Sequence, residues 1–133
     1  MRKYYIRAVQ EALFEEMARD DTTFLMGEDV RIGCFAATRG LCQEFGEERV
    51  IDTPISELAV AGAGVGAAAT GSRPIVDLMF GQFLMLAYDQ VSNQANAMRY
   101  MFGGQTKVPI TYLVQNGTGP CVGPHHSNSV HPM

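Results

Sequence analysis

Apolar residues recur at two different spacings in the first half of the chain, which predicts alternating helices and strands. Residues 5–18 place their apolar side chains on one face of a helix. Residues 24–26 form a short apolar run that ends at Gly27, as expected of a buried strand. Residues 36–45 have helical spacing again and stop at a glycine, and residues 49–51 form a second short strand.

The second half of the chain continues the alternation. A stretch rich in glycine and alanine, residues 52–71, is followed by a strand at 74–79, a long helix at about 82–101 and a strand at 108–114. Strands separated by helices of this length are joined by parallel crossovers. The sequence therefore predicts an α/β fold in which a mostly parallel sheet is flanked by helices.

The composition is that of one folded domain. The chain has 133 residues, of which 47% are apolar and 18% charged, and it contains no low-complexity tract. The final residues, after 114, have the composition of a loop. Because an α/β sheet normally continues past such a loop, we expect one domain over residues 1–133 that is incomplete at its C-terminus.

Charge and cysteine content narrow the possible partners and the compartment. The formal charge is −4, and the ten lysines and arginines are scattered, so the chain has no basic stripe for nucleic acid. The N-terminus lacks a secretory signal, and the longest weakly polar run is too short to cross a membrane. Three cysteines without a paired framework fit a reducing compartment, so we expect a cytoplasmic protein.

The stretch DTPISELAVAGAGVGAAATG, residues 52–71, allows two interpretations. A phosphate-binding loop would need its glycines immediately after a strand, at the opening of a helix. Here the glycines come well after the strand, and Pro54 and Ser56 already give a helix-start signal, with Ser56 as a plausible N-cap. We therefore favour a helix whose small residues let another helix or a ligand approach its backbone.

Glu57 falls in the first turn of this predicted helix. The helix dipole favours a carboxylate at that place, whereas burial would favour the protonated acid, so Glu57 is placed to exchange protons. The alternative is that Glu57 only complements the dipole at the surface. Spacing alone favours this alternative.

Several blocks in order along the chain carry a family resemblance: GEDV at 27–30, DTPISE at 52–57, RPIVDLMF at 73–80, RYMFGGQ at 99–105 and HHSNS at 125–129. The chain resembles the pyrimidine-binding domain of the beta subunit of thiamine-diphosphate-dependent 2-oxo acid dehydrogenases. These proteins are the decarboxylating components of the pyruvate, branched-chain 2-oxo acid and acetoin dehydrogenase complexes. Family members are more than twice as long and have a C-terminal domain that we expect to be absent here.

The resemblance implies a cofactor and a set of partners. Thiamine diphosphate would lie between subunits, with its diphosphate and magnesium held by a partner alpha subunit and its ring end held by this chain. The implied assembly is a heterotetramer with a second beta subunit, which works with a lipoyl-bearing acyltransferase core. No metal site is expected in this chain. Cys121, His125 and His131 could be drawn as a metal cluster, but their spacing matches no recognised zinc site.

The resemblance also assigns roles to individual residues. Glu57 matches the catalytic glutamate, which hydrogen-bonds a ring nitrogen of the aminopyrimidine and favours its imino form. Phe83 matches an aromatic residue that stacks on this ring, and Met79 and Ile55 match apolar contacts to it. Judged by spacing alone, Phe83 is better explained as core packing at the start of a helix.

His126 matches a family histidine that faces the reacting end of the cofactor and takes part in proton transfer or acyl transfer. Histidine suits such a role because it gains and loses a proton near neutral pH. Without the resemblance, a histidine pair in a polar loop is more simply explained as solvated. The family usually has glutamine where this chain has Asn128.

Four functions follow as hypotheses. The first is a beta subunit that helps to decarboxylate a 2-oxo acid and pass the acyl group to lipoamide. The second is an acetoin-cleaving relative, and the third is a remnant that binds an alpha subunit without chemistry. The fourth, a transketolase-like sugar-transfer enzyme, would need the diphosphate motif in the same chain, where it is missing.

Overall fold

The protein is built on one parallel sheet. The computed structural model describes residues 2–117, 119 and 121–130. Four strands lie in the order β2-β1-β3-β4, and every neighbouring pair is parallel. The strands are β1 (Thr23–Gly27), β2 (Val50–Asp52), β3 (Arg73–Phe80) and β4 (Thr111–Gln115). The predicted α/β class, the parallel sheet and the succession of helices and strands along the chain are confirmed.

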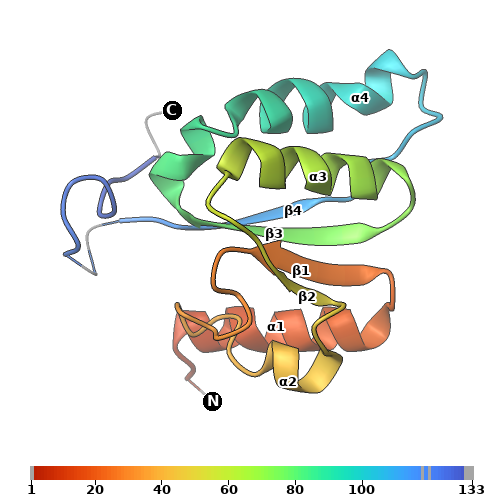
Figure 1. Ribbon diagram of the computed structural model, residues 1–133. Helices are drawn as coiled ribbons and strands as arrows, with labels where there is room; N and C mark the ends of the chain where they lie inside the picture. The colour runs from red at the N-terminus through yellow and green to blue at the C-terminus, as the bar shows by residue number, and fades with distance from the viewer. Residues whose placement is uncertain (1, 118, 120, 131–133) are drawn as a thin grey trace.

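Helices cover both faces of the sheet (Figure 1). On one face lie α1 (Tyr5–Arg19) and the short α2 (Leu41–Phe45). On the other lie α3 (Glu57–Ala69) and, outside it, the segment made of η1 (Gly81–Met85), η2 (Gln90–Ala95) and α4 (Asn96–Met101). Among the described residues, no helix is long and apolar enough to span a membrane.

Each face of the sheet has its own apolar core because alternate strand residues point to opposite sides. Leu25 packs with Met17 and Leu41 below the sheet. Its neighbour Met26 packs with Val60 and Val76 in the core beneath α3. Most residues of β1 and β3 are buried, as expected of parallel strands that are covered on both faces.

The small residues of α3 allow it to pack closely on the sheet. A Cβ atom added at Gly64 would lie 2.7 Å from Val76 and 2.8 Å from Ile110, so only glycine fits there without a shift. A Cβ atom added at Gly62 would lie 3.1 Å from the Gln90 side chain. The prediction of a small-residue helix is confirmed. Ser56 stands at the N-cap position, but its side chain makes no capping hydrogen bond.

Two predicted helices differ from the observed ones. The helix expected at 36–45 begins only at Leu41, because Ala36 and Gly40 adopt φ values of 66° and 89°, outside the right-handed helical region. The helix expected at 82–101 begins as a 3₁₀ turn in η1 and passes through the π-helical η2 before α4. Apolar spacing indicates which face is buried and does not distinguish these helix types.

The last strand also begins later than predicted. Residues 108–114 were expected to form it, whereas β4 spans Thr111–Gln115. Pro109 lacks the backbone N–H that a paired strand residue supplies, so pairing with β3 begins after it, where Ile75 is opposite Thr111. The other three strands lie within one residue of the expected positions.

Candidate functional site

The candidate site lies at the carboxyl edge of the sheet. Because the strands are parallel, the residues that follow them meet at one edge. Glu28 directly follows β1, Thr53 directly follows β2, and Met79 is the second-last residue of β3. In open α/β sheets this edge is the usual place for a ligand.

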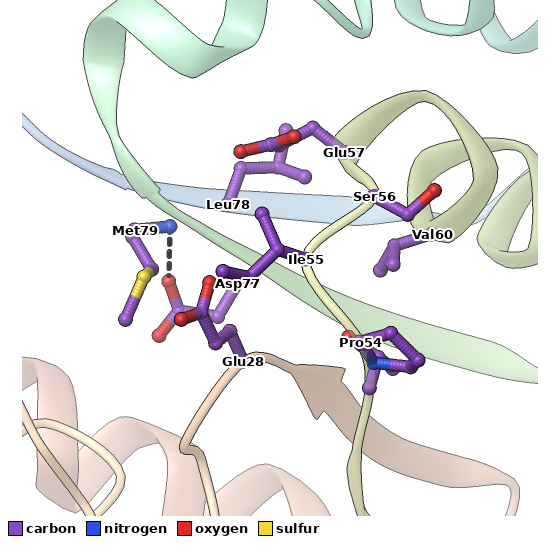
Figure 2. Close-up of a pocket in the computed structure, with 10 residues that line it drawn as sticks. Glu28, Pro54, Ile55, Ser56, Glu57, Val60, Asp77, Leu78 and Met79 are labelled. Atoms are coloured by element: carbon purple, nitrogen blue, oxygen red, sulfur yellow. Dashed lines mark hydrogen bonds between the residues drawn. The ribbon is translucent and has the colours of Figure 1, made fainter.

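A small pocket at this edge joins three segments of the chain (Figure 2). It is lined by Glu28 from the end of β1, by residues 53–57 and Val60 around the start of α3, and by Asp77, Leu78 and Met79 from β3. The hollow holds only about 10 Å³, which is room for roughly one water molecule. A ring could therefore lie only across its mouth.

Glu57 and Ile55 form the side of this pocket that belongs to α3. Glu57 is the first residue of the helix and its side chain is half-buried (Figure 2). It is therefore neither free in solvent nor part of the core. Ile55 is 73% exposed although it is apolar, so it offers a contact surface at the mouth of the pocket.

Met79 has an unusual backbone that β3 imposes on it. Its φ is 60°, a left-handed conformation that costs a non-glycine residue about 1–2 kcal/mol. Asp77 lies opposite Leu113 and Phe80 opposite Gln115, so β3 carries one extra residue between these pairs. Such a bulge redirects the side chains that follow it.

Asp77 holds this bulge. Its carboxylate accepts a hydrogen bond of 2.8 Å from the backbone N–H of Met79, which Figure 2 marks with a dashed line. Burial raises the pKa of the Asp77 carboxyl, and the hydrogen bond from Met79 offsets part of that rise. A half-buried acid thus supports the strained residue beside the pocket.

Glu28 is a second acid at the pocket. Burial raises its pKa, and the negative charges of Asp29 and Glu57 raise it further. The loop after Glu28 is anchored by Arg31, which donates through its backbone N–H to Asp52 at 2.9 Å and through its side chain to the carbonyl of Val50 at 2.9 Å. The position of Glu28 is therefore fixed by the neighbouring strand β2.

Thr53 contributes a buried hydroxyl next to the pocket that it lines. This hydroxyl has no hydrogen-bond partner among the described residues. Buried polar groups are nearly always paired, and an unpaired one costs about 1–3 kcal/mol. The hydroxyl is thus available to a ligand.

An aromatic cluster adjoins the pocket through Phe80, the residue after Met79. The ring of His126 meets Phe80 edge-on, with the ring centres 4.5 Å apart, and meets Phe83 at 5.5 Å. Phe80 and Phe83 are themselves 5.7 Å apart and edge-on, and Phe35 packs on Phe80 at 5.2 Å. Segments that are distant in the sequence therefore meet at the end of β3.

The residues expected at the site fall into two adjoining groups. Ile55, Glu57 and Met79 line the pocket, whereas Phe83 and His126 belong to the aromatic cluster. Their roles stay predictions. Within the described part of the chain, no group of His, Cys, Asp or Glu side chains could hold a metal ion. His131 lies outside that part.

Sequence reasoning missed Glu28, Thr53 and Asp77. A signal for the first two was present, because Glu28 and Thr53 each follow a predicted strand, and residues after parallel strands share an edge. Asp77 lies inside a predicted strand, where an acid is uncommon, but its hydrogen bond to Met79 depends on a bulge that the sequence does not reveal.

Comparison with known proteins identifies the family. Residues 3–133 match the family described as "Transketolase, pyrimidine binding domain". The pyruvate dehydrogenase E1 component subunit beta of Rickettsia felis is 47% identical over 124 residues, which are 92% of this chain and 38% of that protein. The 2-oxoisovalerate dehydrogenase subunit beta of Bacillus subtilis is 44% identical over 128 residues, 95% of this chain and 39% of that protein.

The chain thus spans about two fifths of the length of these relatives. Among solved structures, a split-gene transketolase described as an inactive beta4 tetramer has the same fold, with a TM-score of 0.66 at 18% identity. The likeness covers 92% of this chain and 36% of that one. Together with the parallel sheet and the site at its carboxyl edge, these matches show that the chain belongs to the family of transketolase pyrimidine-binding domains.

Proposed function

We propose that this chain is the pyrimidine-binding part of the beta subunit of a 2-oxo acid dehydrogenase. That subunit would bind thiamine diphosphate and help to decarboxylate a 2-oxo acid and transfer the acyl group to lipoamide. The observation that carries the proposal is the half-buried Glu57 at the start of α3, in a chain 44–47% identical to beta subunits of such dehydrogenases. Relatives acting on pyruvate and on 2-oxoisovalerate both support the 2-oxo acid class.

The residues at the pocket fit the ring end of this cofactor. An aminopyrimidine presents polar nitrogens at its edge and apolar faces. Glu57 and the unpaired hydroxyl of Thr53 offer polar contacts to the edge, and the exposed Ile55 and the largely buried Met79, which both line the pocket, offer apolar contacts. The shallow hollow means that a second polypeptide would have to cover the ring from outside.

When bound, thiamine diphosphate supplies a thiazolium carbon that becomes a nucleophile after losing its proton. We propose that the Glu57 carboxyl donates a hydrogen bond to, or accepts one from, a nitrogen of the aminopyrimidine and so shares its proton. Glu28 lies at the same pocket, where burial and the charges of Asp29 and Glu57 raise its pKa. His126 would act at the reacting end, beside Phe83.

The partners follow from the same proposal. An alpha subunit would hold the diphosphate and magnesium, with two copies of each subunit forming a heterotetramer that serves a lipoyl-bearing acyltransferase in the cytoplasm. Apolar side chains at the start of α3 support a partner there: Ile55, which lines the pocket, is 73% exposed, and Leu58 is 51% exposed. Covering such side chains favours association.

The test is a titration of thiamine diphosphate, with magnesium, into the alpha subunit of a related pyruvate dehydrogenase, alone and mixed with this chain. We expect the chain to raise the affinity, and Glu57→Gln to lower it by about tenfold, equivalent to the loss of one hydrogen bond of about 1.4 kcal/mol. The matched control Glu44→Gln, on the exposed side of α2, should leave the affinity unchanged.

An affinity that the chain does not change would overturn the proposal. Turnover of pyruvate in the same mixture separates the remaining alternatives. A chain that raises cofactor affinity but supports no turnover with any 2-oxo acid would agree with a remnant that binds the alpha subunit without chemistry.

A further inference from the structure

The segment that carries His126, residues 121–130, folds back against the ends of β3 and β4. In Figure 1 it is the dark-blue segment that returns to the start of η1. Two hydrogen bonds hold the C-terminal part of this segment. The backbone N–H of Gly117 donates to the carbonyl of Asn128 at 3.1 Å, and the backbone N–H of Val130 donates to the side chain of Asn116 at 3.0 Å. Val130 also packs so closely on Gly81 that an added Cβ would lie 2.9 Å from it.

Gln82 holds the part of this segment next to His126. In the orientation that its neighbours require, the Gln82 amide nitrogen donates to the carbonyls of Pro124, at 3.2 Å, and of His125. Its amide oxygen accepts a hydrogen bond of 2.7 Å from the side chain of Asn128. One half-buried side chain of η1 therefore contacts residues on both sides of His126.

These contacts explain why the His126 ring lies where it does. His126 itself has a backbone hydrogen bond of 3.2 Å to Gly123, which closes a local turn but does not attach that turn to the sheet. The ring contacts with Phe80 and Phe83 are edge-on, and such contacts are weak individually. Three hydrogen bonds, two donated by Gln82 to Pro124 and His125 and one accepted from Asn128, attach this segment to η1.

We infer that Gln82 is a positioning residue for His126: it fixes the histidine turn against the aromatic cluster at the end of β3. Gln82 and Phe83 are neighbours in η1. The same turn therefore places the Phe83 ring in the aromatic cluster and holds the segment that carries the His126 ring. The catalytic meaning of this arrangement rests on the function proposed above. The arrangement itself requires no cofactor.

The test uses proton NMR of the imidazole rings in the free chain, with the His126 signals assigned through a His126→Gln variant. Gln82→Met keeps the length of the side chain and removes all three hydrogen bonds. We expect the His126 signals, which Phe80 and Phe83 displace in the wild type, to move to the positions of an exposed histidine. The melting temperature should change little, since no core residue is altered.

Gln43→Met is the matched control, because Gln43 is an exposed residue of α2 on the other face of the sheet, and it should leave the His126 signals in place. Unmoved signals in Gln82→Met would overturn the inference. If that variant does not fold, Asn128→Ala removes the hydrogen bond to Gln82 from the exposed side, together with the one that Asn128 accepts from the Ser129 N–H. A partial shift supports the inference, and no shift overturns it. The cofactor titration above tests the proposed function separately.

Discussion

Polar groups are arranged differently at the amino edge of the sheet, where the parallel strands begin, and at the carboxyl edge, where they end. At the amino edge, Arg49 lies just before β2 and is 22% exposed. It donates to the carbonyls of Met17 at 2.6 Å, Asp20 at 3.0 Å and Thr23 at 2.7 Å, and its guanidinium lies 5.1 Å from the centre of the Phe45 ring. One cation thus satisfies the end of α1 and the start of β1 together.

The carboxyl edge leaves the corresponding groups strained or unpaired. Met79 has a left-handed backbone, and the hydroxyl of Thr53 has no partner within the part of the chain that the structure describes. Asp77 and Glu28 carry raised pKa values because burial disfavours their charges. Such features cost free energy in a folded chain and persist where they serve binding or chemistry. The contrast supports the proposal that the carboxyl edge carries the function, whereas the amino edge stabilises the fold.

Replacing Arg49, the cation at the amino edge, should have the largest effect on the free energy of unfolding. Arg49→Met keeps an apolar stem but leaves three carbonyls without their charged donor, so we expect the free energy of unfolding to fall by about 3 kcal/mol. Chemical denaturation measures it. The control Arg99→Met removes an exposed arginine of α4 and should cost less than about 0.5 kcal/mol. Equal effects of the two variants would contradict the contrast.

A double-mutant cycle tests whether Asp77 supports the strain at Met79. Asp77→Ala removes the acceptor of the Met79 N–H. We expect this change to cost about 1 kcal/mol more in the natural chain than in a Met79→Gly background, because glycine adopts a positive φ without help. The four unfolding free energies give this coupling directly. A coupling of zero would mean that the carboxylate does not hold the bulge.

Replacing the unpaired hydroxyl of Thr53 by an apolar group should stabilise the chain. Thr53→Val replaces a buried hydroxyl that has no partner, so we expect a gain of up to about 1 kcal/mol in the free energy of unfolding. The control Thr70→Val should lose stability, because the Thr70 hydroxyl donates to the carbonyls of Gly66 at 3.1 Å and Ala67 at 3.0 Å. A loss in both variants would show that the Thr53 hydroxyl is satisfied in the folded chain.

The smallest expected effects on stability come from removing the charge of one acid at each edge. These effects depend on pH and should have opposite signs at the two edges. The raised pKa of Glu28 means that its contribution to stability is present below the unfolded value of about 4.3 and is lost as pH rises through the folded value. Glu28→Gln should therefore stabilise the chain at pH 7, with the gain vanishing near pH 4. Melting temperatures across this range measure it.

Asp20, at the amino edge, is the counterpart. Hydrogen bonds from the hydroxyl and N–H of Thr22, and the charges of Arg73 and Arg19, hold the pKa of its carboxyl below the usual range. Its contribution is present above the unfolded value of about 3.9 and is lost as pH falls through the folded value. Asp20→Asn should thus destabilise the chain at pH 7, and a gain there would contradict the assignment.

The sequence predicted the features that depend on spacing. The order of helices and strands, the parallel sheet and the small-residue helix α3 follow from apolar periodicity and from glycines that stand away from strand ends. The place of Glu57 in the first helical turn also follows, because Pro54 gives a local start signal.

Other features depend on tertiary contacts and could not be predicted. The left-handed Met79 arises from a bulge between β3 and β4, and no local residue type signals it. The contact between Gln82 and Asn128 joins residues far apart in the chain. Similarly, the start of α2 was misplaced because apolar spacing does not report the backbone of Ala36.

The most direct test of the account concerns the proton that Glu57 is proposed to manage. The measurement is the rate at which the thiazolium C2 proton of thiamine diphosphate exchanges with deuterium, in the complex of this chain with an alpha subunit. We predict that Glu57→Gln slows this exchange by about 100-fold or more, the usual effect of losing an acid–base group. Equal exchange rates in the natural and Glu57→Gln complexes, with the cofactor bound in both, would contradict the account.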